Sequence, residues 1–205
     1  SISHRYALIG ALATGRTTVI RYAPGADCLS TLECLRSLGV KIRYQKGSGD
    51  TDSCVQIEGR GLSGLNETSE DLNAGNSGTT LRLLAGILAA HPFRSTITGD
   101  LSLCHRPMGR IIDPLRAMGA EIQAESNCPP VTILGGQLQG VVWNPTVPSA
   151  QVKSALLLAG LHATGQTTVR EPTLTRDHTE RALTLFGVEV TRAGLAVSIS
   201  GNATP

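Results

Sequence analysis

The stretch from Leu72 to Arg82 joins small residues and glycines to the start of an apolar helix. It reads LNAGNSGTTLR, and the apolar run continues to Ala90. The first N–H groups of a helix have no partner inside the helix, and the helix dipole favours negative charge there. Gly75 and Gly78 allow a ligand to approach the main chain closely. The stretch therefore indicates an anion site, although a Gly/Asn loop before a helix is by itself more typical of a simple cap.

Two other predicted helices start in a similar way. Helices are predicted over residues 1–13, 78–90 and 149–163, and their starts contain the small polar runs SIS, NSGT and PSAQ. Arg5, Arg106 and Arg176 are expected to lie near these helix starts. Three helix N-termini that converge on one face would attract multiply charged anions without many lysines. The alternative is that the serines and the asparagine only cap their helices.

These helices belong to a threefold repeat. In each copy a β-rich run leads to a helix that ends at a glycine, and a second alternating run follows. The repeat glycines are Gly39, Gly119 and Gly187, and their unequal spacing excludes a strict solenoid. A further strand is predicted after each copy, over residues 54–58, 131–134 and 196–200.

The repeat predicts an α/β (α+β) fold made of three βαβαββ units. The three apolar helices are poor in charge and rich in Ala, Leu and Gly, which is typical of helices packed against one another. We therefore expect one domain, residues 1–205, with sheets outside and parallel helices buried inside. Its units are expected at about 1–66, 67–140 and 141–205, and the first strand of the first unit is expected to precede Ser1.

Composition excludes several classes of function. The chain has 205 residues, a net charge of +2 and 3% aromatic residues, which argues against nucleic-acid binding by charge or by stacking. No apolar run approaches the roughly 18 residues of a membrane span, and no signal peptide is visible. The five cysteines form no CxxC pair, which is typical of reduced thiols in the cytoplasm. The chain begins at Ser1 inside a motif, so we expect it to be a piece of a longer protein.

Five short motifs occur in order along nearly the whole chain. They are SISHR at 1–5, GNSGT at 75–79, RPMGR at 106–110, SAQVKSA at 149–155 and TRDHTE at 175–180. Together they resemble the 5-enolpyruvylshikimate-3-phosphate synthase family, and the SAQ and TRDH forms resemble its class II members. The resemblance implies a protein of two domains, each with three βαβαββ units, and an active site in the cleft between them. This chain would be one of the two domains, and the second domain would be its partner.

The resemblance also implies an activity. Members of this family transfer the enolpyruvyl group of phosphoenolpyruvate to the 5-hydroxyl of shikimate 3-phosphate and release phosphate. They work through a tetrahedral ketal-phosphate intermediate and use no metal and no cofactor. The family's acid/base carboxylates lie in the other domain, and one of its lysines would stand just before Ser1. The chain alone is therefore expected to bind substrates without turnover, and it would contain no catalytic residue of its own.

The resemblance assigns binding roles residue by residue. Arginine offers a planar fork for phosphate or carboxylate, and hydroxyl and backbone N–H groups complete such a site. In the family the herbicide glyphosate occupies the phosphoenolpyruvate site, and Gly78 is expected to leave that site open. Leu83 stands where plant-like members have proline, and this difference is expected to loosen the contacts with the inhibitor. The residues expected to hold shikimate 3-phosphate are Ser1, Arg5, Ser149, Ala150, Gln151 and Arg176. Those expected to hold phosphoenolpyruvate are Asn76, Gly78, Arg106 and Gln151.

Other titratable residues near the motifs have simpler interpretations. His4 is expected to pack or cap near the first helix, and His178 to support the loop of Arg176. Asp177 and Glu180 could form an acid/base pair, but their spacing favours ion pairs with Arg176 or Arg181.

Three further positions carry weaker signals. Lys153 is either at a solvent edge or a supporting charge near the site, and the sequence leaves both open. Cys104 is interpreted as a bystander within the RPMG context, although a related enzyme uses a loop cysteine. The GSGD stretch at 47–50 is expected to form a hairpin or surface loop.

A second class of function stays possible from the sequence. The same repeat could serve as a non-catalytic module that binds RNA ends or another protein. The low aromatic content, the scattered Lys and Arg residues and the motif set favour the transferase domain. Binding of shikimate 3-phosphate beside binding of RNA would discriminate the two.

Overall fold

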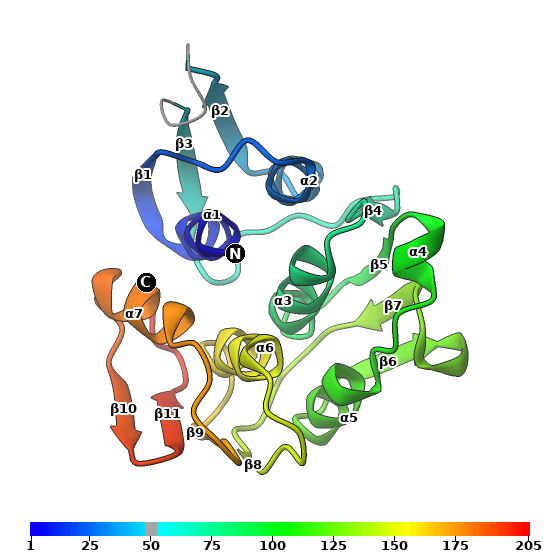
Figure 1. Ribbon diagram of the computed structural model, residues 1–205, viewed down its shortest axis with the longest axis vertical. Helices are drawn as coiled ribbons and strands as arrows, with labels where there is room; N and C mark the ends of the chain where they lie inside the picture. Colours follow the sequence, from blue (N-terminus) through cyan, green and yellow to red (C-terminus); the bar gives the residue numbers. More distant parts are fainter. Residues whose placement is uncertain (48–52) are drawn as a thin grey trace.

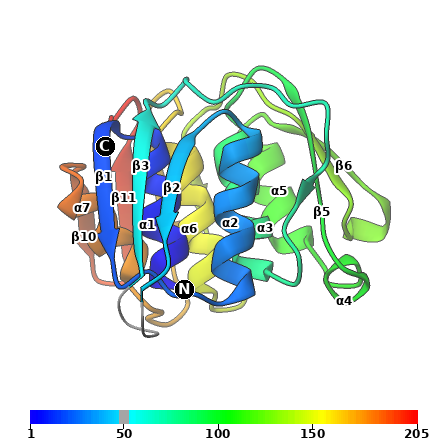
Figure 2. The same cartoon turned by 90° about the horizontal axis from the view of Figure 1, so that it is seen from above.

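The structure is a computed structural model, and it describes residues 1–47 and 53–205. Three apolar helices lie at its centre, and Figure 1 looks nearly along them: α1 (Ile2–Leu12), α3 (Gly78–Leu88) and α6 (Ala150–Gly160). Three sheets and the remaining helices surround this centre (Figures 1 and 2). The predicted fold, with sheets outside and buried helices inside, is confirmed. Residues 48–50 of the GSGD stretch lie outside the described residues, so the expected hairpin or loop there stays a prediction.

The remaining elements fall into three consecutive groups. Around α1 lie β1 (Thr14–Ile20), α2 (Ala26–Ser37), β2 (Lys41–Gln45) and β3 (Cys54–Arg60). Around α3 lie β4 (Leu72–Asn73), β5 (Arg94–Thr98), α4 (Leu101–Cys104), α5 (Gly109–Ala117), β6 (Glu121–Ala124), a short 3-10 turn (Glu125–Asn127) and β7 (Val131–Leu134). Around α6 lie β8 (Val142–Trp143), β9 (Gln166–Arg170), α7 (His178–Leu185), β10 (Val190–Ala193) and β11 (Ala196–Ser200).

The three sheets share the order of their three antiparallel strands, and the second and third sheets add a short parallel strand at one edge. Their strand orders are β1-β3-β2, β4-β5-β7-β6 and β8-β9-β11-β10. The short strands β4 and β8 run parallel to β5 and β9, and all other described pairs are antiparallel. In the second and third groups the element order is therefore βαβαββ, with α4 as an addition in the second. The division of the chain at 66/67 and 140/141 stays a prediction.

The repeat glycines occupy equivalent places after α2, α5 and α7. Gly39, Gly119 and Gly187 have φ angles of 85°, 111° and 84°. This left-handed conformation lets a helix end and turn into the next strand without the strain that a Cβ would cause. The predicted helix ends therefore agree with the structure.

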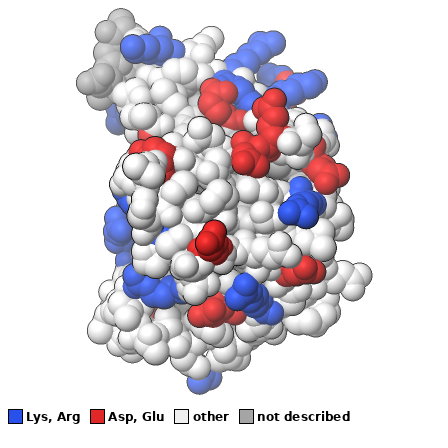
Figure 3. Space-filling view, turned by 90° about the vertical axis from the view of Figure 1, so that its right-hand side faces the viewer, with Lys and Arg blue, Asp and Glu red and all other residues white. Residues whose placement is uncertain are grey.

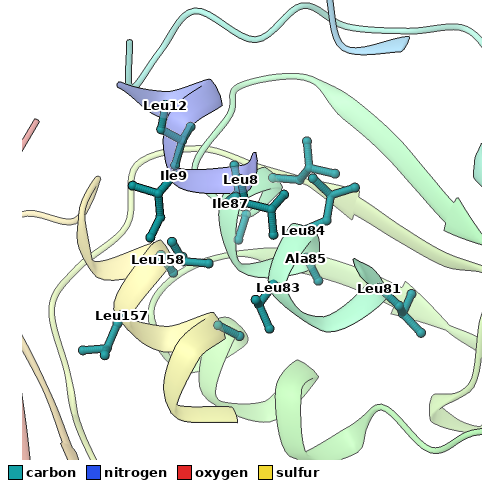
Figure 4. Packing of buried hydrophobic residues seen from close by; sticks show 14 of the residues in the cluster. Leu8, Ile9, Leu12, Leu81, Leu83, Leu84, Ala85, Ile87, Leu157 and Leu158 are labelled. Atoms are coloured by element: carbon teal, nitrogen blue, oxygen red, sulfur yellow. The ribbon is translucent and has the colours of Figure 1, made fainter. Parts of the chain in front are cut away.

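The core lies where the three central helices meet. Side chains from α1, α3 and α6, among them Leu8, Ile87 and Leu158, pack together there (Figure 4). The backbones of α3 and α6 come especially close, because a Cβ on Gly86 would lie 2.3 Å from the carbonyl oxygen of Ala155. Such close packing holds the N-terminal ends of the helices at one end of the molecule.

The outer surface carries charge of both signs. Figure 3 shows one outer face, where blue and red side chains are interspersed and no broad field of one sign is seen. Each of the five cysteines lies within the described residues and is a free thiol. None of the described helices is long and apolar enough to cross a membrane.

Candidate functional site

The N-terminal turns of α1, α3 and α6 contact one another directly. His4 Nε2 lies 3.2 Å from Ser77 Oγ, which joins the start of α1 to the start of α3. The Gln151 side-chain amide of α6 donates to Thr79 Oγ1 of α3 at 3.0 Å. The predicted convergence of three helix N-termini is therefore present in the structure. Their unpaired N–H groups and dipoles favour an anion at this end of the molecule.

The serines at these starts have different local partners. Ser77 Oγ accepts from the backbone N–H of Thr80 at 3.1 Å, and Ser149 Oγ accepts from that of Val152 at 3.3 Å. Both are therefore helix caps, as the alternative interpretation proposed, but capping does not remove them from the converging face. Ser1 is the N-cap residue of α1 but makes no side-chain capping bond, and its hydroxyl instead accepts from Arg5 Nη1 at 2.9 Å.

An open groove lies at the start of α6. Its volume is about 570 Å³, and the only charged side chain among its lining residues is the exposed Arg176. Four residues predicted to hold shikimate 3-phosphate are brought together here. The lining residues are Pro148, Ser149, Ala150, Gln151, Leu174, Thr175 and Arg176.

Arg5 is placed behind this groove. Its side chain is 2% exposed, and Nε donates to Thr179 Oγ1 at 2.6 Å while Nη2 donates to Ser154 Oγ at 2.9 Å. Nη1 donates to both oxygens of Ser1. These bonds occupy four of the five guanidinium N–H groups. Burial first, and then the positive charge of Arg176, lowers the pKa of Arg5. Arg5 therefore ties α1 to α6 and α7 and keeps one N–H for a ligand.

A second group of polar and cationic side chains surrounds Gly78 at the start of α3, and we call it the Gly78 cluster. Arg106 Nη2 donates to Asn76 Oδ1 at 2.7 Å, and Asn76 Nδ2 donates to Asp100 Oδ2 at 2.7 Å. The Asp100 carboxylate also accepts from the backbone N–H of Leu103 at 2.8 Å. The hydrogen bond from Asn76, followed by that from Leu103, lowers the pKa of Asp100, so its carboxylate stays ionised. Asn76 therefore orients Arg106, as the prediction that it shapes this loop requires.

Arg82 completes the cluster, and the sequence-based assignment of ligands omitted it. A Cβ on Gly78 would lie 2.5 Å from Arg82 Nη1 and 3.4 Å from Arg106 Nη1, so both guanidinium groups lie over this glycine. Burial first, and then the charges of Arg106 and Arg110, lowers the pKa of Arg82. The signal was available, because an arginine four residues after a helix start lies on the same face one turn later.

Gln151 lies between the two clusters. Its Oε1 accepts from Arg82 Nη1 at 2.9 Å, and Gln151 also lines the groove that holds Arg176. This side chain is therefore placed to contact ligands on both sides. Of the residues predicted to bind, Asn76, Gly78, Arg106 and Gln151 form one cluster, and Ser149, Ala150, Gln151 and Arg176 line the neighbouring groove.

The histidines of the motifs have separate environments. His4 is buried, its Nδ1 lies 3.4 Å from Cys28 Sγ, and burial is the main cause that lowers its pKa to about 4. It is therefore neutral and packs between elements, as predicted. His178 is the first residue of α7, and its Nδ1 is buried without a hydrogen-bond partner among the described residues. Its support of the Arg176 loop stays a prediction.

One expectation about charged residues is wrong, and one of two open interpretations is excluded. Glu180 was expected to pair with Arg176 or Arg181, but its carboxylate faces inward and lies 2.6 Å from Lys153 Nζ. Lys153 is 1% exposed, so its interpretation as a solvent-edge residue is excluded. Both outcomes have one cause, because α7 turns Glu180 toward α6 and α6 turns Lys153 toward α7. The Cys104 thiol donates to the carbonyl oxygen of Gly99 at 3.5 Å, and its bystander role stays a prediction.

Comparison with known proteins places this geometry in a family. Residues 1–204 match the family model described as EPSP synthase (3-phosphoshikimate 1-carboxyvinyltransferase). Two proteins with that second name, from Brevibacillus brevis and Geobacillus kaustophilus, are each 53% identical over 203 residues, which are 98% of this chain and 46% of the relative.

Solved structures agree with the sequence comparison. An EPSP synthase structure from Acinetobacter baumannii superposes with a TM-score of 0.92 at 48% identity and covers 99% of this chain and 45% of that chain. The chain therefore spans about half the length of the relatives that it matches. It belongs to the EPSP synthase family.

Proposed function

We propose that this chain is the domain of a 3-phosphoshikimate 1-carboxyvinyltransferase that holds shikimate 3-phosphate and phosphoenolpyruvate side by side. The observation that carries the proposal is the position of Gln151. Its side chain is bonded to Arg82 in the Gly78 cluster, and it belongs to the groove that contains Arg176. Two anion sites that share one neutral side chain suit two anionic substrates that must approach each other. The names of the relatives supply 3-phosphoshikimate and the transferred carboxyvinyl group, and the family resemblance implies phosphoenolpyruvate as the donor.

The groove at α6 is proposed to bind shikimate 3-phosphate. A phosphate dianion there meets the N-terminus of an 11-residue helix and the exposed guanidinium of Arg176. Ser149 and the backbone of Ala150 supply further polar groups at the helix start. Ser1 and Arg5 border this site, and Arg5 acts mainly by fixing its neighbours, because most of its N–H groups are already engaged.

The Gly78 cluster is proposed to bind phosphoenolpyruvate. The start of α3 brings free N–H groups, and Arg106 offers a guanidinium that Asn76 has already oriented. The missing side chain at Gly78 gives the ligand access to the space beneath Arg82 and Arg106. Carboxylate and phosphate groups are both suited to such planar forks.

The proposed reaction joins the 5-hydroxyl oxygen of shikimate 3-phosphate to the substituted vinyl carbon of phosphoenolpyruvate. The hydroxyl proton leaves that oxygen and a proton adds to the methylene carbon, which gives a tetrahedral ketal phosphate. Loss of phosphate and of one methyl proton then restores the double bond. This chain's contribution is to hold both anions in contact, which removes much of the entropic cost of their meeting.

Proton transfer is proposed to use groups of the remaining half of the protein. Two carboxylates near the two sites are already engaged, Asp100 by Asn76 and Glu180 by Lys153. The remaining half is the proposed partner, and the chain alone is expected to bind without turnover. The five free thiols suit a reducing compartment, so we place the protein in the cytoplasm.

The proposal is tested by calorimetric titration of the full-length protein with shikimate 3-phosphate. Arg176→Ala removes a charge-assisted contact worth roughly 1.5–3 kcal/mol, so the dissociation constant should rise about 10- to 150-fold. Arg181→Ala is the matched control, because Arg181 is also exposed and lies five residues away.

The titration also discriminates the alternative function. A wild-type protein that binds short RNA but no shikimate 3-phosphate would refute the transferase assignment and favour a binding module. Equal effects of the two alanine variants would show that Arg176 does not contact the phosphate.

A further inference from the structure

Four charged side chains, three of them buried, form a cluster beside the Arg176 groove. Lys153 Nζ lies 2.9 Å from Glu171 Oε2 and 2.6 Å from Glu180 Oε1. Arg192 Nη2 closes the cluster at 2.9 Å from Glu180 Oε1 and 3.5 Å from Glu171 Oε2. The Lys153 side chain is 1% exposed and that of Arg192 is 33% exposed. We call these four residues the ion cluster.

The ion cluster joins the elements that carry the proposed phosphate ligands. Lys153 is on α6, two residues after Gln151, and Glu171 directly follows β9. The Glu171 carboxylate accepts hydrogen bonds from both the backbone N–H and the hydroxyl of Thr175. Thr175 is the neighbour of Arg176, whereas the intervening residues 172–174 are exposed. The cluster therefore fastens the loop that presents Arg176.

A second connection leads from the cluster to Arg5. Glu180 follows Thr179, whose hydroxyl accepts from Arg5 Nε and lies 2.6 Å from Ser154 Oγ. The Glu180 charge also acts on Arg5, because its negative charge favours the protonated guanidinium. The cluster thus affects both arginines assigned to shikimate 3-phosphate.

Charge balance gives the cluster a role beyond holding elements together. Burial raises the pKa of Glu171, but hydrogen bonds from Thr175 and Lys153 outweigh burial and the net shift is downward, so this carboxylate is ionised. Two carboxylates then face two cations. Without Lys153 an uncompensated negative charge would lie beside the groove and repel a phosphate. A buried ion pair contributes little net stability, because desolvation of the charges offsets their attraction.

We propose that Lys153 is a positioning residue for shikimate 3-phosphate: it fixes the Arg176 loop through Glu171 and cancels the carboxylate charge next to the phosphate site. The inference rests on the proposed function. The proposed role of Lys153 is specific for one substrate, because Arg82, Arg106 and Asn76 of the Gly78 cluster make their contacts outside the ion cluster.

The test compares three variants in the full-length protein. Lys153→Met keeps the length of the side chain and removes its charge, and Arg192→Met makes the same charge change at a partly exposed position where folding is more tolerant. The double variant Lys153→Met/Glu180→Gln removes one charge of each sign and so restores the balance. Arg36→Met is the matched control, because Arg36 is 34% exposed and pairs with Glu33 far from the site.

The readouts are the calorimetric dissociation constant for shikimate 3-phosphate and the KM for phosphoenolpyruvate. We expect the dissociation constant to rise at least tenfold in Lys153→Met and at least threefold in Arg192→Met. The double variant should bind more tightly than Lys153→Met but less tightly than wild type, because it restores the charge balance and not the contact between Lys153 and Glu171. The KM for phosphoenolpyruvate should change less than threefold in all variants.

Each outcome decides the inference. If Lys153→Met does not fold, Arg192→Met and the double variant give the answer. Unchanged shikimate 3-phosphate binding in Lys153→Met, or in Arg192→Met if Lys153→Met does not fold, would overturn the positioning role. Parallel losses for both substrates would also overturn it, since a merely structural residue would affect both sites. A wild-type protein that binds no shikimate 3-phosphate would instead refute the proposed function.

Discussion

Substitution of Gly78 by alanine tests the placement of the phosphoenolpyruvate site. The added Cβ would lie 2.5 Å from Arg82 Nη1, so that guanidinium must move by about 1 Å to reach ordinary van der Waals contact. The movement breaks the 2.9 Å hydrogen bond from Arg82 to Gln151 Oε1. The methyl group also fills space beneath Arg106, whose Nη1 would lie 3.4 Å away.

The expected magnitude follows from the broken hydrogen bond. A hydrogen bond from a charged group contributes roughly 1.5–3 kcal/mol, which corresponds to about a 10- to 150-fold change in an equilibrium constant. The KM for phosphoenolpyruvate should therefore rise at least tenfold. Stability should not fall, because Arg82 is flexible and alanine favours the helix by up to about 1 kcal/mol relative to glycine.

The assay measures steady-state kinetics and thermal unfolding of the full-length protein. Gly109→Ala is the control, because Gly109 is also the first residue of a helix and its Cβ would meet nothing closer than Asn127 Nδ2 at 3.7 Å. If glyphosate shares the phosphoenolpyruvate site, as the family resemblance implies, its inhibition constant should rise in Gly78→Ala as well. Equal KM values for the two variants would refute the placement of Gly78 in this pocket.

Two predictions concern stability. Gly86→Ala should lower the free energy of unfolding by about 1–3 kcal/mol in urea titrations, because its Cβ would lie 2.3 Å from the backbone oxygen of Ala155. Gly136→Ala is the control and should be neutral, because the space around Gly136 is open. Equal effects of the two substitutions would contradict the close contact between α3 and α6. Acid should destabilise the fold through His91, which is buried, and His162, which is half-buried with a buried Nε2. Desolvation first, and then the charge of His91, lowers the pKa of His162 to about 3, and desolvation also lowers that of His91. The unfolded chain then binds more protons below pH 6.5, so the free energy of unfolding should fall by up to roughly 1.4 kcal/mol per pH unit per histidine as the pH decreases from 6.5. Urea titrations at pH 7.5 and 5 measure this loss of stability. His162→Phe should weaken the dependence of the free energy of unfolding on pH. Equal stability of the wild type at both pH values would show that the histidines are not held neutral.

The sequence predicted the elements whose signals are local. The strands expected over residues 131–134 and 196–200 match β7 and β11, because alternation of apolar and polar residues directly reflects the two faces of a sheet. The helices expected to reach residues 90 and 163 end earlier, at Leu88 and Gly160. Apolar composition overestimates their length, because residues such as Ala89 and Ala163 remain buried in the turns that follow.

The sequence could not predict contacts that depend on the packing of distant elements. Lysine is usually exposed, and nothing near Lys153 indicated that its partners would be Glu171 and Glu180, which are 18 and 27 residues away. The spacing of Glu180 favoured local ion pairs, but burial of α7 against α6 determined its true partner. The strands β4 and β8 are two residues long, too short for any periodicity to show.

The distribution of cations explains how a chain with a net charge of +2 can hold two multiply charged ligands. Arg5 and Lys153 are buried, and their charges are used to fix neighbouring hydroxyls and carboxylates. Arg176 is exposed, and Arg106 is half-buried and bonded to a neutral amide, so both keep their charge for a ligand. The fixed cations reduce the conformational freedom that the ligand-facing groups would otherwise lose on binding. The helix N-termini add attraction without adding side-chain charge, so the site can favour anions while the rest of the surface stays mixed in sign.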